Sequence, residues 1–431
     1  MLKTELRFFN VFPSVVQAGK TTEITIAPNR KCCSFPEKQY KIRVVPREKR
    51  DIPRNQAYNI LGNTFNELIV EPKDGKLVFS YEFKDEQEYR IIIFGNQDKR
   101  LYTFMIYALA DDLYGTVPFR GDLHMHSDHS DGLGSLCELV SNYREQGYDF
   151  VCVTDHHKHY PSVMAKEMFA SVDTGLTIFP GEEVHNCDMG YIHIINFGGK
   201  YSVNEIIESD YEALVEKIRK VADKLEVPEG IDAFEVALRG WICDEIRKSG
   251  GKAIYPHPFW TICDEYHVET DMSLYTLKSG MYDIYELFGG CTVTENQIQQ
   301  AMYQELRTEG VDLPIVGSTD THDFVKGSCF FDWYNTIVFA KDKDGIVDAI
   351  MNKYSVAVQN TGVDAPQAYG KFRLIKYAYF LLENFYPVYE TYTKDIGSLM
   401  RAYIAYGDCK ESLEGVNEKA QEFKKKYFGI E

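Results

Sequence analysis

The 431-residue sequence has no C-x-x-C pair among its ten cysteines, which are scattered along the chain. Paired, closely spaced cysteines are typical of secreted disulfide frameworks and of cysteine-rich zinc sites, so the sequence argues against both and favours reduced thiols. A signal peptide is not recognisable either, because Lys3, Glu5 and Arg7 precede any apolar stretch. Together with the lack of any run of about 18 apolar residues, these features predict a cytoplasmic protein with no membrane partner.

Positive charge is also scarce. Acidic residues outnumber Lys and Arg by 65 to 47, which gives a formal net charge of −18. Nucleic-acid binding depends on phosphate contacts from an excess of Lys and Arg, so we expect no nucleic-acid partner. A local cationic pocket for a small anion remains compatible with an acidic surface.

Histidine is absent from residues 1–123 and 323–431, so all eleven histidines lie between His124 and His322. The middle of the chain is therefore where we expect the chemistry. The composition is otherwise that of a folded protein, with 44% hydrophobic and 14% aromatic residues, and the length suits two or three domains.

Three regions differ in their sequence pattern. Residues 1–115 contain short alternating segments separated by turns, which predicts a small antiparallel β-sandwich. In residues 116–361, apolar runs alternate with helical stretches, which predicts a parallel α/β barrel with a helical insertion near 201–233. Residues 362–431 are helical and aromatic-rich, and we expect them to pack on the barrel.

Seven apolar runs of the middle region can each form a buried strand. They are Arg120–His126, Phe150–Asp155, Thr177–Val184, Tyr191–Phe197, Lys252–His257, Tyr282–Phe288 and Pro314–Asp320. A capping box of Ser135 and Glu138 begins one of the intervening helices, and Gly250-Gly251 ends another.

Histidines and carboxylates follow these runs closely. His124 and His126 are two residues apart on a strand, so their imidazoles project from the same face and can chelate one ion. The further candidates at strand ends are Asp131, Asp155, His156, Glu182, Glu183, His193, His257, Asp320 and His322. Each by itself is compatible with a solvated loop residue. Because C-terminal strand ends of a parallel barrel converge on one mouth, the whole set predicts a metal site.

This ordered set resembles the PHP (polymerase and histidinol phosphatase) family over residues 119–325. The matching motifs are His124-x-His126 with Asp131, Thr154-Asp155-His156, Gly181-x-Glu183, His193, His257-Pro258 and Asp320-x-His322. The leader domain and the Arg120-Gly121-Asp122-Leu123-His124 entry look like the branch typified by the CehA and McbA hydrolases.

The resemblance implies a distorted (β/α)7 TIM-like barrel that holds two to three divalent metal ions, of Zn, Mn or Fe. It assigns His124, His126, Glu183 and Asp320 to the first ion, with Glu183 bridging to a second ion completed by His193 and His257. Asp131, His156 and His322 would hold a third. Because two glutamates stand together here, Glu182 is an alternative to Glu183.

Mixed imidazole and carboxylate ligands suit Zn, Mn, Fe or Co, and such ions lower the pKa of a bound water to about 7. We therefore expect a metal-bound water to be the nucleophile, with Asp155, His159 and Glu286 as supporting groups. His157, His159 and His185 are each either a proton donor, a substrate contact or a solvent-facing residue. Lys158 and Lys326 either contact an anionic substrate or lie on the surface, and Trp260 either lines the pocket or packs. His129 and His267 are expected on the surface.

These observations predict a metal-dependent hydrolase of a small, anionic ester, with a phosphoesterase favoured. A carboxylic or carbamate ester hydrolase is the alternative, because no Arg/Lys cluster for phosphate is evident. A non-enzymatic binding protein is a third hypothesis, and a polymerase-associated role is disfavoured by the charge and the missing polymerase body.

Overall fold

The computed structural model describes residues 3–49, 65–186, 191–324, 330–362 and 365–430. The chain forms two compact units. One comprises Met1–Val117, Lys376–Tyr392 and Glu418–Glu431, and the other comprises Pro118–Ile375 and Thr393–Asn417. Lys326, a candidate substrate contact, lies outside the described residues. Among those described, no helix is long and apolar enough to span a bilayer.

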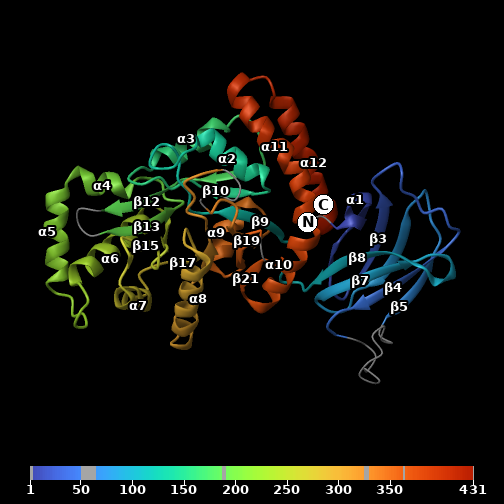
Figure 1. Ribbon diagram of the computed structural model, residues 1–431, viewed down its shortest axis with the longest axis horizontal. Helices are drawn as coiled ribbons and strands as arrows, with labels where there is room; N and C mark the ends of the chain where they lie inside the picture. Colours follow the sequence, from blue (N-terminus) through green and yellow to red (C-terminus); the bar gives the residue numbers. More distant parts are fainter. Residues whose placement is uncertain (1–2, 50–64, 187–190, 325–329, 363–364, 431) are drawn as a thin grey trace. The chain divides into compact units, whose positions relative to one another are not determined.

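The first unit contains two sheets, coloured blue in Figure 1. β1 (Phe9–Phe12), β3 (Thr21–Pro28) and β6 (Leu77–Glu82) form one. The other has the order β2 (Val15–Gln17), β8 (Arg100–Leu109), β7 (Gln87–Phe94), β4 (Tyr40–Pro46) and β5 (Asn66–Val70). Alternate residues of both sheets, such as Ile24, Ile42 and Ile91, are fully buried in one core. The pairing departs from the expected antiparallel pattern at one place, because β2 runs parallel to β8. A short helix, α1 (Thr4–Phe8), precedes the strands.

The second unit is a mixed α/β structure whose described residues form two large sheets and one small two-stranded sheet. The first has the order β11 (Thr177–Phe179), β10 (Phe150–Cys152), β9 (Val117–Asp122), β19 (Tyr334–Ala340), β20 (Ser355–Gln359) and β21 (Gln367–Gly370). The second has the order β12 (Gly181–Asn186), β13 (Ile192–Phe197), β14 (Lys252–Tyr255), β17 (Ile284–Phe288) and β18 (Ile315–Gly317). Two isolated parallel bridges, Met125 to Thr321 and His156 to Glu183, connect the sheets at one end.

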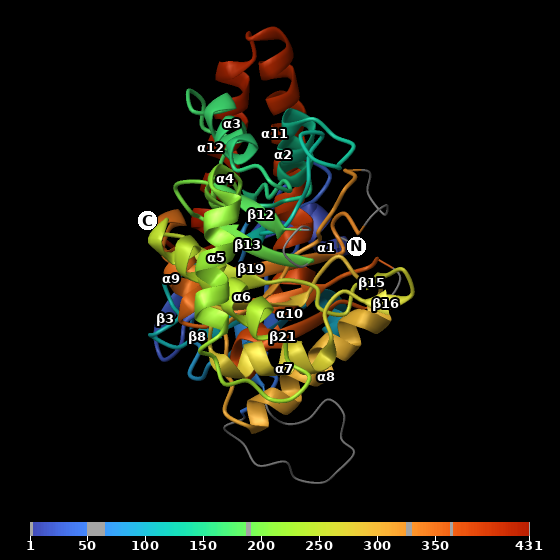
Figure 2. The same cartoon turned by 90° about the vertical axis from the view of Figure 1, so that its left-hand side faces the viewer.

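Helices of the second unit begin and end where local signals predict. At the start of α2 (Leu136–Glu145), the Ser135 hydroxyl accepts a hydrogen bond from the Glu138 amide. The Glu138 carboxylate in turn accepts one from the Ser135 amide, which completes the expected capping box. Asp232 caps α6 (Ala233–Lys248) in the same position. The expected helical insertion contains α4 (Val203–Ser209) and α5 (Tyr211–Ala222), and α5 packs beside α6 in Figure 1. The remaining helices are α3 (Tyr160–Met168), α7 (Thr270–Ser279), α8 (Val293–Thr308) and α9 (Ile346–Met351), with α7 and α8 side by side in Figure 2.

The C-terminal region contains three helices: α10 (Phe372–Asn384), α11 (Tyr386–Tyr406) and α12 (Lys410–Phe428). The sequence predicted helices over Lys371–Phe385 and Asp395–Tyr406 only. Each of the three has part of its length in each compact unit.

Both large sheets contain antiparallel pairs, against the expectation of a parallel sheet: β20 is antiparallel to β19 and β21 in the first, and β13 is the antiparallel strand of the second. β13 pairs antiparallel with both β12 and β14, whereas β14, β17 and β18 are parallel to one another. The physical reason is the short connection from β12 to β13, which a hairpin can span but a parallel crossover cannot. β13 therefore begins, rather than ends, near the C-terminal ends of its neighbours.

Candidate metal centre

His124 and His126 project into one cluster from the segment that continues β9. Leu123 and Met125 are fully buried on the opposite face, as strand alternation requires. The buried Asp122 carboxylate holds this segment in place, because it accepts hydrogen bonds from the Tyr143 hydroxyl at 2.7 Å, the Thr319 hydroxyl at 2.6 Å and the His124 amide.

Glu183 lies at the centre of the cluster and contacts five imidazoles. Its Oε2 atom is 3.2 Å from His124 Nε2, 3.3 Å from His126 Nε2 and 3.1 Å from His156 Nδ1. Its Oε1 atom is 2.8 Å from His193 Nδ1 and 3.3 Å from His257 Nε2. The two oxygens thus face different sets of histidines.

Asp320 completes the group around the first two histidines. Its Oδ1 atom is 2.9 Å from His126 Nε2 and 3.1 Å from His124 Nε2. The backbone at Asp320 has a φ of 49°, a left-handed conformation that is rare outside glycine and is held here by its surroundings. Gly290 allows the close approach, because a Cβ atom at that position would collide with the Asp320 side chain.

Asp131 gathers a further group nearer the surface. Its carboxylate is 3.3 Å from His322 Nε2, 3.6 Å from His156 Nε2 and 3.8 Å from His126 Nδ1. Its side chain is 56% exposed, whereas those of Glu183 and His126 are fully buried. The cluster therefore extends from the interior to solvent.

The ligand atoms of three sets lie within 4.8 Å of one another. The sets are His124, His126, Glu183 and Asp320; His126, Asp131, His156 and His322; and His193, His257 and His267. The structure thus brings together all nine residues that the sequence singled out as ligands. It adds His267, which was expected on the surface.

The donor set fits divalent cations. His124 Nε2 and His126 Nε2 lie 3.2 Å apart, and both face Glu183 Oε2 and Asp320 Oδ1. Imidazole nitrogens and carboxylate oxygens pointing at a common centre match the ligand preference of Zn, Mn and Fe.

The electrostatics reflect the same concentration of carboxylates. Burial opposes protonation of His126, but hydrogen bonds and charge from Asp320 and Glu183 outweigh it and raise its pKa to about 9. Burial also disfavours charge on Glu183, yet the surrounding histidines hold its pKa well below the usual range. Burial lowers the pKa of His156 to about 3 and that of His185 to about 4. Positive charge is therefore favoured on His126, beside Asp320 and Glu183, and disfavoured on His156 and His185.

Two further carboxylates hold the ligands in position. Glu286, on β17, is 3.0 Å from His124 Nδ1 through Oε2 and accepts from the His257 amide through Oε1. A proton on His124 Nδ1 leaves Nε2 with its lone pair toward the cluster. Asp155 instead accepts from the Ser127 amide and hydroxyl and from the Ser130 hydroxyl, which anchors the loop that carries Asp131.

Glu182 points away from the cluster, because successive strand residues face opposite sides. Its carboxylate accepts hydrogen bonds from Asn196, Ser202, Asn204 and the Val203 amide, and so attaches the start of α4 to β12. Of the two adjacent glutamates, Glu183 alone contacts the histidines.

The other histidine and lysine candidates separate into two groups. His185 lines the cavity with its Nδ1 atom 3.1 Å from His156 Nδ1, and His157 stacks on it from outside. His159 is buried against the Gly199 carbonyl at 2.9 Å, away from the cavity lining. The Lys158 ammonium donates to the His129 carbonyl, and His129 packs on Tyr160.

His193 lies in the cluster because β13 runs antiparallel to β12 and β14. It stands at the beginning of β13, so its side chain meets those that follow the ends of β14 and β18. His267 follows the small hairpin of β15 (Thr261–Ile262) and β16 (Glu265–Tyr266), and its ring centroid lies 4.5 Å from that of His193. No strand or motif in the sequence marks this histidine, since the hairpin alone brings it back to His257.

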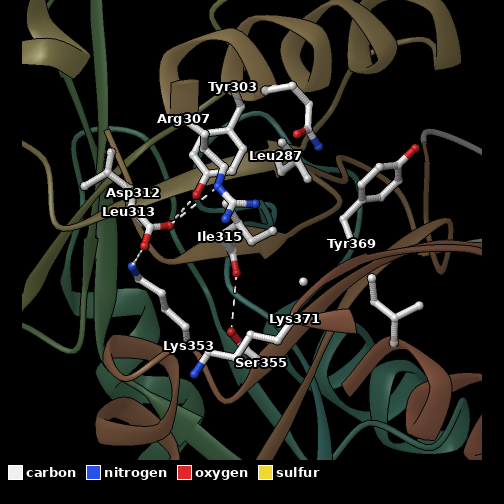
Figure 3. Close-up of a pocket in the computed structure, with 13 residues that line it drawn as sticks. Leu287, Tyr303, Arg307, Asp312, Leu313, Ile315, Lys353, Ser355, Tyr369 and Lys371 are labelled. Atoms are coloured by element: carbon white, nitrogen blue, oxygen red, sulfur yellow. Dashed lines mark hydrogen bonds and ion pairs between the residues drawn. The ribbon is translucent and has the colours of Figure 1, made fainter. Parts of the chain in front are cut away.

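The cluster opens into a cavity of about 330 Å³. Tyr191, Trp260 and Phe330 line it together with the cluster, and among its described lining residues there is no Lys or Arg. A separate cavity of about 220 Å³ lies between α8, β18 and β21 (Figure 3). There Asp312 stands between Arg307 and Lys353, and histidine is absent from the described lining.

No protein-family model and no curated protein matches this sequence. Among solved structures, the chain is similar to a two-domain protein from Bacteroides vulgatus that contains a predicted PHP-like metal-dependent phosphoesterase. The TM-score is 0.39 at 19% identity, over 57% of this chain and 66% of that one, just under two thirds of its length. A proposed metal-dependent phosphoesterase from Bifidobacterium adolescentis gives 0.37 at 15% identity, over 53% of this chain and 95% of that one. An amidohydrolase from Chromobacterium violaceum, with bound sulfate and no metal, gives a TM-score of 0.32 at 16% identity. This match covers 47% of this chain and 87% of that one. Likenesses this weak carry no argument about activity.

Proposed function

We propose that this protein is a metal-dependent hydrolase of the PHP type that cleaves a phosphate ester. The observation that supports this most is the position of Glu183, whose two oxygens face two different groups of histidines. An apolar residue would pack at this buried position at least as well as a carboxylate with five imidazole contacts. Packing therefore does not explain the presence of Glu183.

In this proposal, His124, His126, Glu183 and Asp320 hold one ion, and Glu183, His193 and His257 contribute to a second. Asp131, His156 and His322 hold a third. Bound ions would supply a water of lowered pKa as nucleophile and polarise the scissile ester.

The chain's own residues give the site its charge and its shape. Three divalent ions against the carboxylates of Asp131, Glu183 and Asp320 leave a net charge of about +3, which favours an anionic substrate. Glu286 keeps the His124 proton on Nδ1, and Asp155 holds the loop of Asp131. Tyr191, Trp260 and Phe330 form the aromatic part of the cavity lining. His185 is neutral at pH 7, so it offers one N–H donor and one acceptor but no charge.

A carboxylic or carbamate ester is the second candidate substrate. The lack of Lys and Arg among the described residues of the cavity lining favours it, because phosphate sites often include a guanidinium or ammonium. We also propose that the protein is related to the CehA and McbA hydrolases.

The test is a paired hydrolysis assay on chelator-stripped protein, with Mn²⁺ or Zn²⁺ added back. Aryl phosphate mono- and diesters are compared with aryl carboxylic esters by kcat/KM. We expect phosphate release that requires metal and is lost in the His124→Ala/His126→Ala double variant. Preference for the carboxylic ester would establish the second candidate, and activity that survives the double variant would contradict both.

A further inference from the structure

His267 is brought to the cluster by the fold of a short hairpin. The Trp260 amide donates to the His257 carbonyl at 3.0 Å, and the His267 amide donates to the Trp260 carbonyl at 2.7 Å. The Val268 amide donates to the Pro258 carbonyl at 3.1 Å, so the two ends of the segment that contains the hairpin are hydrogen-bonded to each other. His267 therefore lies beside His257, with ring centroids 5.3 Å apart, although ten positions separate them.

The protonation of this imidazole follows from its hydrogen bond. His267 Nε2 is 2.8 Å from the Tyr191 carbonyl oxygen. A carbonyl only accepts, so the proton is on Nε2 and Nδ1 keeps a lone pair. Nδ1 is buried and has no hydrogen-bond partner among the described groups. A buried acceptor without a partner is costly and calls for an explanation.

The neighbours of this free nitrogen are histidines rather than hydrogen-bond donors. Ligand atoms of His193, His257 and His267 all lie within 4.8 Å of one another. His193 Nδ1 and His257 Nε2 are also 2.8 and 3.3 Å from Glu183 Oε1. Three imidazoles thus surround a single small volume, and two of them also contact Glu183 Oε1.

We propose that His267 is a further metal ligand, acting through Nδ1 on an ion that it holds together with His193 and His257. The hydrogen bond from Nε2 to the Tyr191 carbonyl is the outer contact that orients a ligating imidazole and sets its tautomer. This inference rests on the proposed function in that it assumes a metal-binding cluster. Nothing in the PHP resemblance assigns position 267.

The consequence concerns the number of ligands for this ion. His193, His257 and His267 together would supply three imidazoles, which is the number of protein ligands in many zinc sites. Without His267, two imidazoles of this set would remain.

The experiment measures metal binding to the full chain rather than activity. His267→Gln keeps an N–H donor for the Tyr191 carbonyl but lacks the imidazole lone pair, and His267→Ala removes both. His129→Ala is the control, because His129 packs on Tyr160 outside all three ligand sets. Zn²⁺ content is measured by elemental analysis after graded chelation, Zn²⁺ affinity by titration calorimetry, and coordination by the visible spectrum of Co²⁺-substituted protein. Circular dichroism verifies that each variant is folded.

We expect both His267 variants to bind one equivalent at least about 10-fold more weakly than wild type and to lose the corresponding tetrahedral Co²⁺ band. The His129→Ala variant should match wild type. Full, tight binding by His267→Gln would overturn the proposal and leave His267 as an anchor of the hairpin, whatever His267→Ala does. Absence of metal binding in wild type would instead contradict the proposed function itself.

Discussion

The two cavities of the second unit both place carboxylates against basic side chains, but the bases differ in kind. In the cluster cavity Glu183 and Asp320 face imidazoles, which have a lone pair when neutral. In the cavity of Figure 3, Asp312 faces Arg307 and Lys353, which are permanent cations at neutral pH. An imidazole can exchange its proton for a metal ion, whereas a guanidinium or ammonium neutralises the carboxylate and leaves it no ligand role. The same charge balance therefore gives a candidate metal centre in one place and an ion pair in the other.

The largest effect should come from neutralising the central carboxylate. Glu183→Gln replaces one of the two oxygens that face the histidine groups by an NH₂ group and removes the negative charge, and we expect at least one equivalent of metal to be lost. Loss of about 4 kcal/mol of transition-state stabilisation corresponds to about a 10³-fold fall in kcat/KM for the phosphate ester. Elemental analysis and the hydrolysis assay measure both. Retained metal with normal turnover would remove the bridging role from the proposal.

Metal-free protein should lose stability with rising pH. The pKa of His126 is about 9 in the folded chain against an ordinary 6.5, so its contribution is fully present below pH 6.5 and is lost as pH rises through 9. The loss is on the order of 3 kcal/mol, at about 1.4 kcal/mol for each unit of pKa difference. Thermal or urea unfolding of chelated protein at pH 6, 7.5 and 9 measures it. Zn²⁺-loaded protein is the control, because its ligand histidines are already unprotonated; equal pH dependence in both forms would contradict the assignment.

Glu286→Gln should weaken metal binding without emptying the site. The amide retains the acceptor for His124 Nδ1 but not the negative charge, and such outer contacts typically contribute 10- to 100-fold in affinity. Competition with a chromophoric chelator measures the dissociation constant. Glu182→Gln is the matched control: it changes a carboxylate that is equally buried but bonded to the start of α4, so it should lower stability while leaving metal affinity unchanged.

The smallest effect is expected at Asp312. Asp312→Asn removes ion pairs with Arg307 and Lys353 that are half exposed, so the free energy of unfolding should change by less than about 1 kcal/mol. Metal content should equal that of wild type. A loss of metal in this variant would show that the two cavities are coupled. It would contradict the view that Asp312 takes no part in metal binding.

The common face of the first two histidines could be predicted from the sequence because strand alternation is a local rule. His124 and His126 share a face for that reason, and the same rule separates Glu183 from Glu182, although only the contacts show which of the two faces the cluster. The capping box of Ser135 and Glu138 also required only neighbours in the chain. The direction of β13 was predicted wrongly, because a period-two pattern is the same in either direction.

By itself, the sequence determined the candidate ligands and the strands that they follow, since periodicity and spacing act over a few residues. Only the tertiary structure showed the contacts among them. It showed that Glu183 lies among five imidazoles, that Glu286 hydrogen-bonds His124, and that a hairpin returns His267 to His257. Those relations depend on contacts between segments far apart in the chain. They also depend on backbone turns, and a local sequence pattern does not predict where such a turn places the residues that follow it.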